Sequence, residues 1–185
     1  QAEKQVNDFE VQIDLTCTEL IAKRQPTARD LRLVMAVSKA ITNLERAGDE
    51  AERVAKRSKR IIEQSVNNKI NAAEIKLSGQ MAIDLLRQSL DCFARLDAVG
   101  AAKVVEDDKQ IDEEFRGFVR KLITYMAEDP KMISTGLDLL FIAKAIERIG
   151  DHAKNIAEFV IYIAKGSDVR HVSHQDLIRE ASKSD

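Results

Sequence analysis

The chain has 185 residues, of which 44% are hydrophobic and 32% charged, and its formal net charge is −2. This balance excludes proteins that bind nucleic acid through a strong basic charge, and the 4% of aromatic residues leave few side chains for base stacking. With only two prolines and seven glycines, the composition favours an all-α protein of one or two domains.

The expected helices follow from apolar side chains that recur every three or four residues. Gln25-Pro26 and Asp129-Pro130 interrupt this pattern, and Asn67-Asn68 indicates a further turn. Asp97 is a candidate N-cap, and Lys165-Gly166 is typical of a helix end. We therefore expect helices over 2–24, from Thr27 to about Val66, and over 71–96, 98–127 and 131–165, with one short helix after His174.

Two further features concern the surroundings of the protein. The sequence contains no apolar run of about 18 residues and no secretory signal pattern, so we expect a cytoplasmic protein without direct membrane insertion. The basic run 56–60 is interpreted as a solvated helix face, with a patch that binds an anion or a partner as the alternative. Cys17 and Cys92 are isolated in the sequence, so we expect reduced, buried thiols.

The pattern acid-x-x-x-Asp occurs twice in each half of the chain, in the same order. The matches extend beyond the acids, because Gln-Ile-Asp and Glu-Arg-x-Gly-Asp both recur about 100 residues apart. The chain therefore contains an internal repeat. The four copies of the pattern are Glu10/Asp14 and Glu45/Asp49 in the first half, and Asp108/Asp112 and Glu147/Asp151 in the second half.

Each repeat supplies two helices joined by a proline-containing turn, and the second repeat carries the helix 71–96 in front of them. We therefore expect two tandem three-helix bundles. The first repeat lacks a counterpart of that helix, so we expect a natural upstream helix of roughly 30–45 residues to be missing and an apolar stripe to be left uncovered. The expected divisions are an N-terminal repeat at 1–67, a C-terminal repeat at 68–166 and a polar tail at 167–185.

The paired acids indicate a metal site. On a helix, residues i and i+4 lie on one face about 5–6 Å apart at Cβ, where two carboxylates repel each other unless a cation lies between them. Two such pairs on neighbouring helices supply four hard oxygen donors, which favour Mg²⁺ or Mn²⁺ and leave iron or zinc as alternatives. An alternative interpretation also stays open, in which the acids are ordinary solvated side chains on the flanks of their helices.

The helical wheel places these acids at the border of the packed face. We therefore expect a shallow, solvent-open site with little desolvation of the carboxylates. Gly48 and Gly150 recur beside the acids and indicate close approach of neighbouring helices or ordinary tight packing. His152 is expected at the surface, turned away from Asp151.

The segments 22–34 and 146–157, together with the repeated Glu-Arg-x-Gly-Asp motif, resemble the PhoU family of bacterial phosphate-signalling regulators. The resemblance covers nearly the whole chain. It implies two similar three-helix bundles, often dimeric, with metal bound at the bundle surface by acid-x-x-x-Asp motifs. Carried over residue by residue, the implied metal ligands are Glu10, Asp14, Glu45, Asp49, Asp108, Asp112, Glu147 and Asp151.

By this resemblance the protein is a cytoplasmic adaptor rather than an enzyme. It would link the ATPase subunit of the Pst phosphate transporter to the sensor histidine kinase of the Pho system. Through that link it would negatively regulate phosphate uptake and the Pho regulon, and it would form a homodimer.

Two alternatives differ in class from an adaptor. One is a carboxylate-bridged metalloenzyme, a phosphatase or an oxidase, and the other is a metal-free helical scaffold. The sequence contains no P-loop and no Ser/His/Asp or Cys/His order, and nothing in it marks a pocket. We therefore expect no catalytic residues.

Overall fold

The computed structural model describes residues 2–63, 73–166, 168–169, 172 and 174–182. These residues form the expected all-α protein, and the predicted helices agree with the observed ones to within a few residues. The turn predicted at Asn67-Asn68 lies outside the described residues. The helices are α1 (Ala2–Arg24), α2 (Ala28–Glu63), α3 (Ala73–Arg95), α4 (Ala98–Glu128), the 3₁₀ turn η1 (Pro130–Met132), α5 (Ile133–Lys165) and α6 (His174–Ala181).

Local chemistry sets the ends of the helices in the second repeat. The Asp97 carboxylate accepts a hydrogen bond from the backbone N–H of Gly100 at 2.9 Å, which confirms the predicted N-cap of α4. Gly166 ends α5 with a φ of 75°, a left-handed conformation that a residue with a Cβ adopts only with strain. Pro130 opens the short 3₁₀ turn between α4 and α5.

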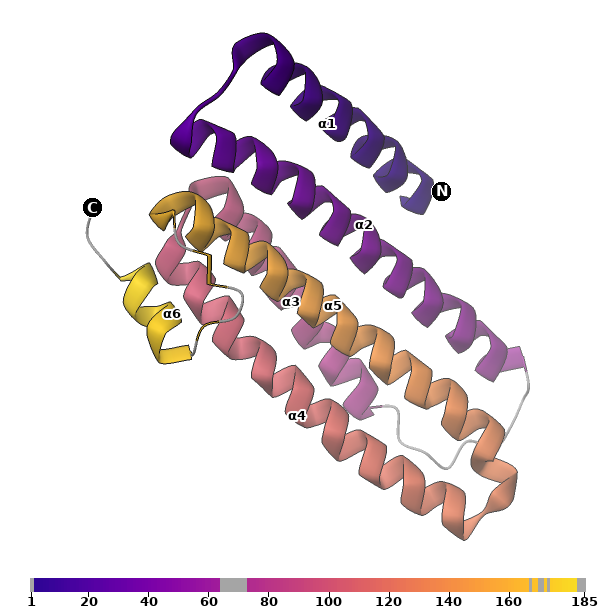
Figure 1. Cartoon of the computed structure of the whole chain (residues 1–185). Helices are drawn as coiled ribbons and strands as arrows, with labels where there is room; N and C mark the ends of the chain where they lie inside the picture. The colour runs from indigo at the N-terminus through magenta and orange to yellow at the C-terminus, as the bar shows by residue number, and fades with distance from the viewer. Residues whose placement is uncertain (1, 64–72, 167, 170–171, 173, 183–185) are drawn as a thin grey trace.

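The helices α3, α4 and α5 pack against one another as a three-helix bundle. In addition α2 contacts α5, and α1 contacts α2. Figure 1 shows α1, α2, α5 and α4 side by side in that order. The largest fully buried side chains of the core are Ile111, Leu122, Ile156, Ile161, Ile163, Val104 and Val160.

The first helix pair carries the uncovered apolar side chains that the sequence predicts. Phe9, Val11 and Leu15 of α1 are exposed, as is Met35 of α2. The second repeat differs because α3 covers the corresponding side of its helix pair. The N-terminal helix pair is therefore held by the packing of α1 against α2 and of α2 against α5.

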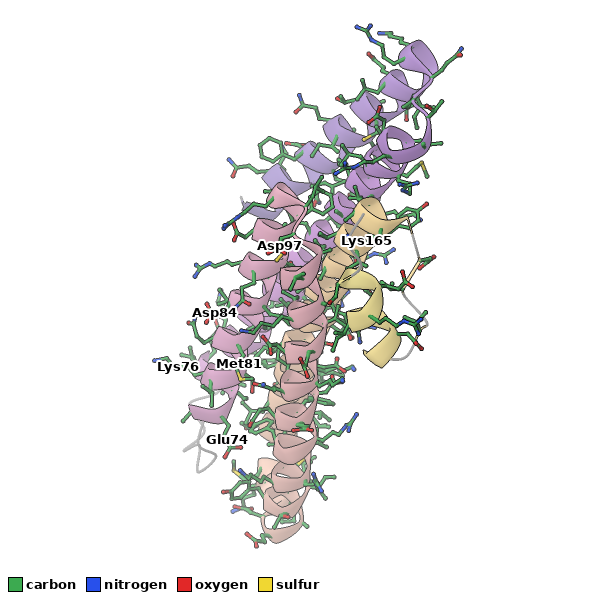
Figure 2. The ribbon with its side chains drawn as sticks, turned by 90° about the vertical axis from the view of Figure 1, so that its left-hand side faces the viewer. Glu74, Lys76, Met81, Asp84, Asp97 and Lys165 are labelled. Atoms are coloured by element: carbon green, nitrogen blue, oxygen red, sulfur yellow. The ribbon has the colours of Figure 1, made fainter. Side chains whose placement is uncertain are left out.

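The C-terminal tail is attached to the bundle through its predicted short helix. Leu177 and Ala181 of α6 are buried, and α6 contacts both α4 and α5. Figure 2 shows the bundle from the side of α3 and α4, with Asp84 on the outer side of α3 and Lys165 at the end of α5. Of the helices described, none combines the length and hydropathy that a membrane span needs.

Candidate metal centre

The antiparallel contact between α2 and α5 brings the two Glu-Arg-x-Gly-Asp motifs together. Asn155 on α5 donates a hydrogen bond to the side chain of Asn43 on α2 at 3.0 Å. About two helical turns further along each helix, in opposite chain directions, Arg148 donates to Glu50 at 3.1 Å. This register places the two motifs beside each other near the middle of both helices.

An open groove of about 610 Å³ lies where the two motifs meet. The sequence analysis found no sign of a pocket, so this groove is a feature that it missed. Carboxylates and cations alternate along its walls. The groove is lined among others by Glu45, Arg46 and Asp49 of α2, and by Arg148, Asp151 and Lys154 of α5.

Asp108 is the most unusual of the predicted ligands, because it is almost completely buried, with 1% of its surface exposed. The ammonium of Lys154 lies 3.4 Å from its Oδ2 atom, yet this oxygen has no hydrogen-bond partner among the described residues. The pKa of Asp108 is raised to about 6, because burial and the charges of Asp151 and Asp112 raise it more than Lys154 lowers it. A buried, incompletely satisfied carboxylate oxygen is a favourable place for a cation.

The burial of Asp108 corrects the expectation of a shallow site with little desolvation. A Cβ atom added at Gly150 would lie 2.8 Å from Oδ1 of Asp108 and 3.1 Å from the side chain of Ile111. The missing side chain at Gly150 therefore lets α4 approach α5 and encloses the carboxylate. Gly48 has no atom within 4 Å of such a Cβ position, so close packing explains only one of the two glycines.

The remaining acids of the second repeat are half-buried beside Asp108. Burial raises the pKa of Asp151, Lys154 lowers it, and the charge of Asp112 raises it. Glu147 accepts hydrogen bonds from the ammonium of Lys144 at 2.6 Å. Asp112 and Asp151 are therefore near enough to Asp108 to influence its charge, and lysines partly neutralise Asp108 and Glu147.

The acids of the first repeat are arranged more loosely. Asp14 accepts a hydrogen bond from the hydroxyl of Ser38 at 2.6 Å, which joins α1 to α2. Glu10 is half-buried on α1, while Glu45 and Asp49 border the groove on α2. Within the described part of the chain, the side chains as placed bring together no group of three or more His, Cys, Asp or Glu residues that could hold a metal ion.

One residue of the site differs from its expected position, and two others were not expected there. His152 is half-buried rather than at the surface, and its Nδ1 lies 3.1 Å from the side-chain oxygen of Asn43. Burial lowers its pKa. Glu50 is buried in the groove between α2 and α5, and Lys154 contacts Asp108. Lys154 was predictable, because it follows Asp151 by three residues and so lies on the same helix face.

Removing the Asp108 charge is expected to change the pH dependence of stability. Because its folded pKa lies above its unfolded value, the folded state binds more protons between about pH 4 and 6, and stability falls as the pH rises through that window. In chelator, wild type should lose about 2 kcal/mol relative to Asp108→Asn between pH 4.5 and 7. Urea unfolding at several pH values measures this, with Asp84→Asn as control. A difference that stays constant with pH would contradict the assignment.

Comparison with known proteins is consistent with this arrangement of repeats. The sequence profile described as the PhoU domain matches residues 1–58 and 75–160. The chain belongs to the PhoU family. All eight predicted metal ligands lie within the matched residues.

Curated relatives and solved structures of the PhoU family are similar over most of the chain. The chain is 53% identical to a PhoU homolog of Burkholderia sp, called a phosphate-specific transport system accessory protein, over 97% of this chain and 77% of that protein. It is 44% identical to the PhoU protein of Escherichia coli (strain K12), over 96% of this chain and 73% of that protein.

Two crystal structures share the fold. PhoU from Pseudomonas aeruginosa gives a TM-score of 0.86 at 42% identity, over 89% of this chain and 78% of that one. The phosphate transport system regulatory protein PhoU from Streptococcus pneumoniae gives a TM-score of 0.81 at 28% identity, over 90% of this chain and 77% of that one.

Proposed function

We propose that this PhoU chain is a cytoplasmic accessory protein of phosphate-specific transport and a negative regulator of phosphate uptake and Pho signalling. Its family and the names of its relatives support a role in phosphate transport. In the finer proposal, the protein links the ATPase subunit of the Pst transporter to the sensor histidine kinase of the Pho system. It acts as a homodimer.

The proposal includes metal binding, which is supported by the buried Asp108, whose Oδ2 atom is paired with the Lys154 ammonium at 3.4 Å but has no hydrogen-bond partner among the described residues. Asp112, Glu147 and Asp151 would complete a set of oxygen donors beside it, which suits Mg²⁺ or Mn²⁺, with iron or zinc as alternatives. The first repeat would use Glu10, Asp14, Glu45 and Asp49. A bound metal ion would supply positive charge that joins the two helices of a repeat.

Metal binding would also change the groove. Lys144 and Lys154 now neutralise Glu147 and Asp108. A metal ion at these carboxylates would compete with both ammonium groups and free them toward solvent. Because Lys154 lines the groove between α2 and α5, metal occupancy would alter the surface that the protein offers to its partners.

Capture of the transporter ATPase subunit tests the link between metal and partner. Immobilised wild-type protein should bind the purified ATPase subunit and the cytoplasmic part of the kinase at least about tenfold more tightly with Mn²⁺ than with chelator. Asp108→Asn combined with Asp151→Asn should reduce this difference, whereas Asp84→Asn on the outer side of α3 should keep it in full (Figure 2). If the partners bind equally well with Mn²⁺ and with chelator, metal has at most a structural role.

The open groove keeps one alternative testable, namely a carboxylate-bridged metalloenzyme. An enzyme of this kind needs a cavity next to its metal ligands, and the groove borders Glu45, Asp49 and Asp151. Robust phosphatase or oxidase turnover by the metal-loaded protein, abolished by Glu147→Ala, would replace the adaptor proposal. Turnover no faster than the uncatalysed reaction in buffer alone would leave the adaptor proposal in place.

A further inference from the structure

The ion pairs along one side of α2 and α5 share an asymmetry, because the carboxylate is buried and the cation is exposed. Asp138 has 4% of its side chain exposed, whereas its partners Arg57 and Arg60 have 34% and 61%. Glu50 has 6% exposed, whereas Arg148 has 53%. The carboxylates lie in the protein interior and pair with these cations, so the guanidinium groups form the outer surface.

The same asymmetry continues on α5, and it is not general to the molecule. Glu147 has 12% of its side chain exposed, against 46% for Lys144. By contrast, both members of the Lys23–Glu19 pair on α1 are well exposed, at 71% and 67%. This side of the molecule therefore presents positive charge to solvent, although the whole chain carries a net charge of −2.

An exposed apolar row runs along α5 beside these cations. Ile133, Leu137 and Phe141 are exposed at helical spacing i, i+4 and i+8, and hence lie on one face. The guanidinium of Arg57 lies 4.0 Å from the centre of the Phe141 ring, which places the α2 cations next to this row. Lys144 and Arg148 continue the same face toward the groove.

We propose that this stripe binds an amphipathic helix of a partner protein, with one apolar face and carboxylates along its flanks. The row from Ile133 to Arg148 is about 22 Å long, which matches a helical segment of about 15 residues. The stripe is defined by Arg57 and Arg60 of α2 and by Ile133, Leu137, Phe141, Lys144 and Arg148 of α5.

The arginines suit carboxylates because their positions are fixed before binding. Arg57 is hydrogen-bonded to Asp138 at 2.9 Å and stacks on Phe141, so its planar group loses little freedom when it takes a second carboxylate. A membrane surface fits less well, since a helix that lies in the interface needs a broader apolar face than three side chains.

A second copy of the chain also fits poorly. A two-fold dimer through this surface would place the stripe against itself and bring its cations face to face, where like charges repel. The occupant is therefore a different, acidic segment. The proposal deepens the adaptor function by giving the chemistry of one partner contact, and it does not depend on bound metal.

A designed peptide provides the test. The probe is a fluorescein-labelled helix of about 18 residues with leucine along one face and glutamate on both flanks. The control peptide carries lysine in place of glutamate. Binding is followed by fluorescence anisotropy at two salt concentrations, in chelator and again with Mn²⁺. The stripe variant is Arg60→Glu with Leu137→Ser, and the matched control is Arg87→Glu with Leu77→Ser on the exposed side of α3.

Wild type and the α3 variant should bind the acidic peptide equally, and the stripe variant at least about tenfold more weakly, with affinity falling as salt rises. Thermal melts show that the variants are folded. Absent binding, or binding that the stripe variant retains, would overturn the proposal. So would binding of phosphatidylglycerol vesicles instead of the peptide, or a dimer by ultracentrifugation that the stripe variant dissociates. If the peptide fails while Mn²⁺ binding succeeds, the proposed function survives without this contact.

Discussion

Addition of Mn²⁺ is expected to raise the melting temperature of the wild-type protein by about 5–10 °C. A ligand at 100 times its Kd adds about 2.7 kcal/mol of stability, and for a protein of this size each kcal/mol shifts the melting temperature by about 2–4 °C. The physical reason is the oxygen of the buried Asp108 that has no hydrogen-bond partner among the described residues, together with its neighbours Asp112 and Asp151, which a divalent cation would satisfy.

Substitutions separate this binding from general salt effects. Asp108→Asn combined with Asp151→Asn removes two charges of the second repeat but keeps the side-chain size, so the shift should fall to the part that the acids of the first repeat supply. Asp84→Asn keeps the acids of the centre and should retain the full shift. Differential scanning fluorimetry over a series of Mn²⁺ concentrations measures both. An equal shift in all three proteins would show that the predicted ligands of the second repeat do not hold the ion.

The two glycines of the repeated motif should respond in opposite directions to alanine. Gly48 has open space where the Cβ atom of an alanine would lie, so Gly48→Ala should stabilise the protein by about 1 kcal/mol through helix propensity. Gly150→Ala should destabilise it by about 1–2 kcal/mol. Its Cβ would lie 2.8 Å from the buried Asp108 carboxylate and 3.1 Å from Ile111, and overpacking of this kind outweighs the gain in propensity.

Urea unfolding of both variants measures these differences, and Mn²⁺ titration adds a second readout. Displacement of Asp108 by the new methyl group should reduce the Mn²⁺ shift in Gly150→Ala and leave that of Gly48→Ala close to wild type. The two glycines occupy equivalent positions of the repeat, so each variant is the control for the other. Stabilisation by both substitutions would mean that α4 and α5 are further apart at this point than the structure shows.

The helices were predictable because their signals are local. Apolar spacing, the two prolines, Asp97 and Gly166 fix where helices begin and end, and all of these act within a few residues of the chain. The pairing of acids on one helix face was also predictable from the i, i+4 spacing. These features need no knowledge of how the helices are placed against one another.

The depth of the site was not predictable, because it depends on distances between helices. A helical wheel gives the direction of Asp108 but not how closely α5 approaches it, which Gly150 decides. In the same way, the basic run 56–60 was interpreted as solvated. Most of the run is exposed, but two of its arginines also hold the buried Asp138, which lies about 80 residues further along the chain. Contacts of this range require the register of α2 against α5.

The two ends of the groove between α2 and α5 differ from each other. Glu50 and His152 stand at equivalent positions of the duplicated segment, but Arg148 is bonded to the glutamate, whereas its counterpart Arg46 lies close enough to the histidine to help lower its pKa. Identical halves would have made the two ends interchangeable. Divergence at this position, and at the equivalent Arg53 and Asn155, gives the groove a direction, so an elongated charged molecule would bind there in a single orientation.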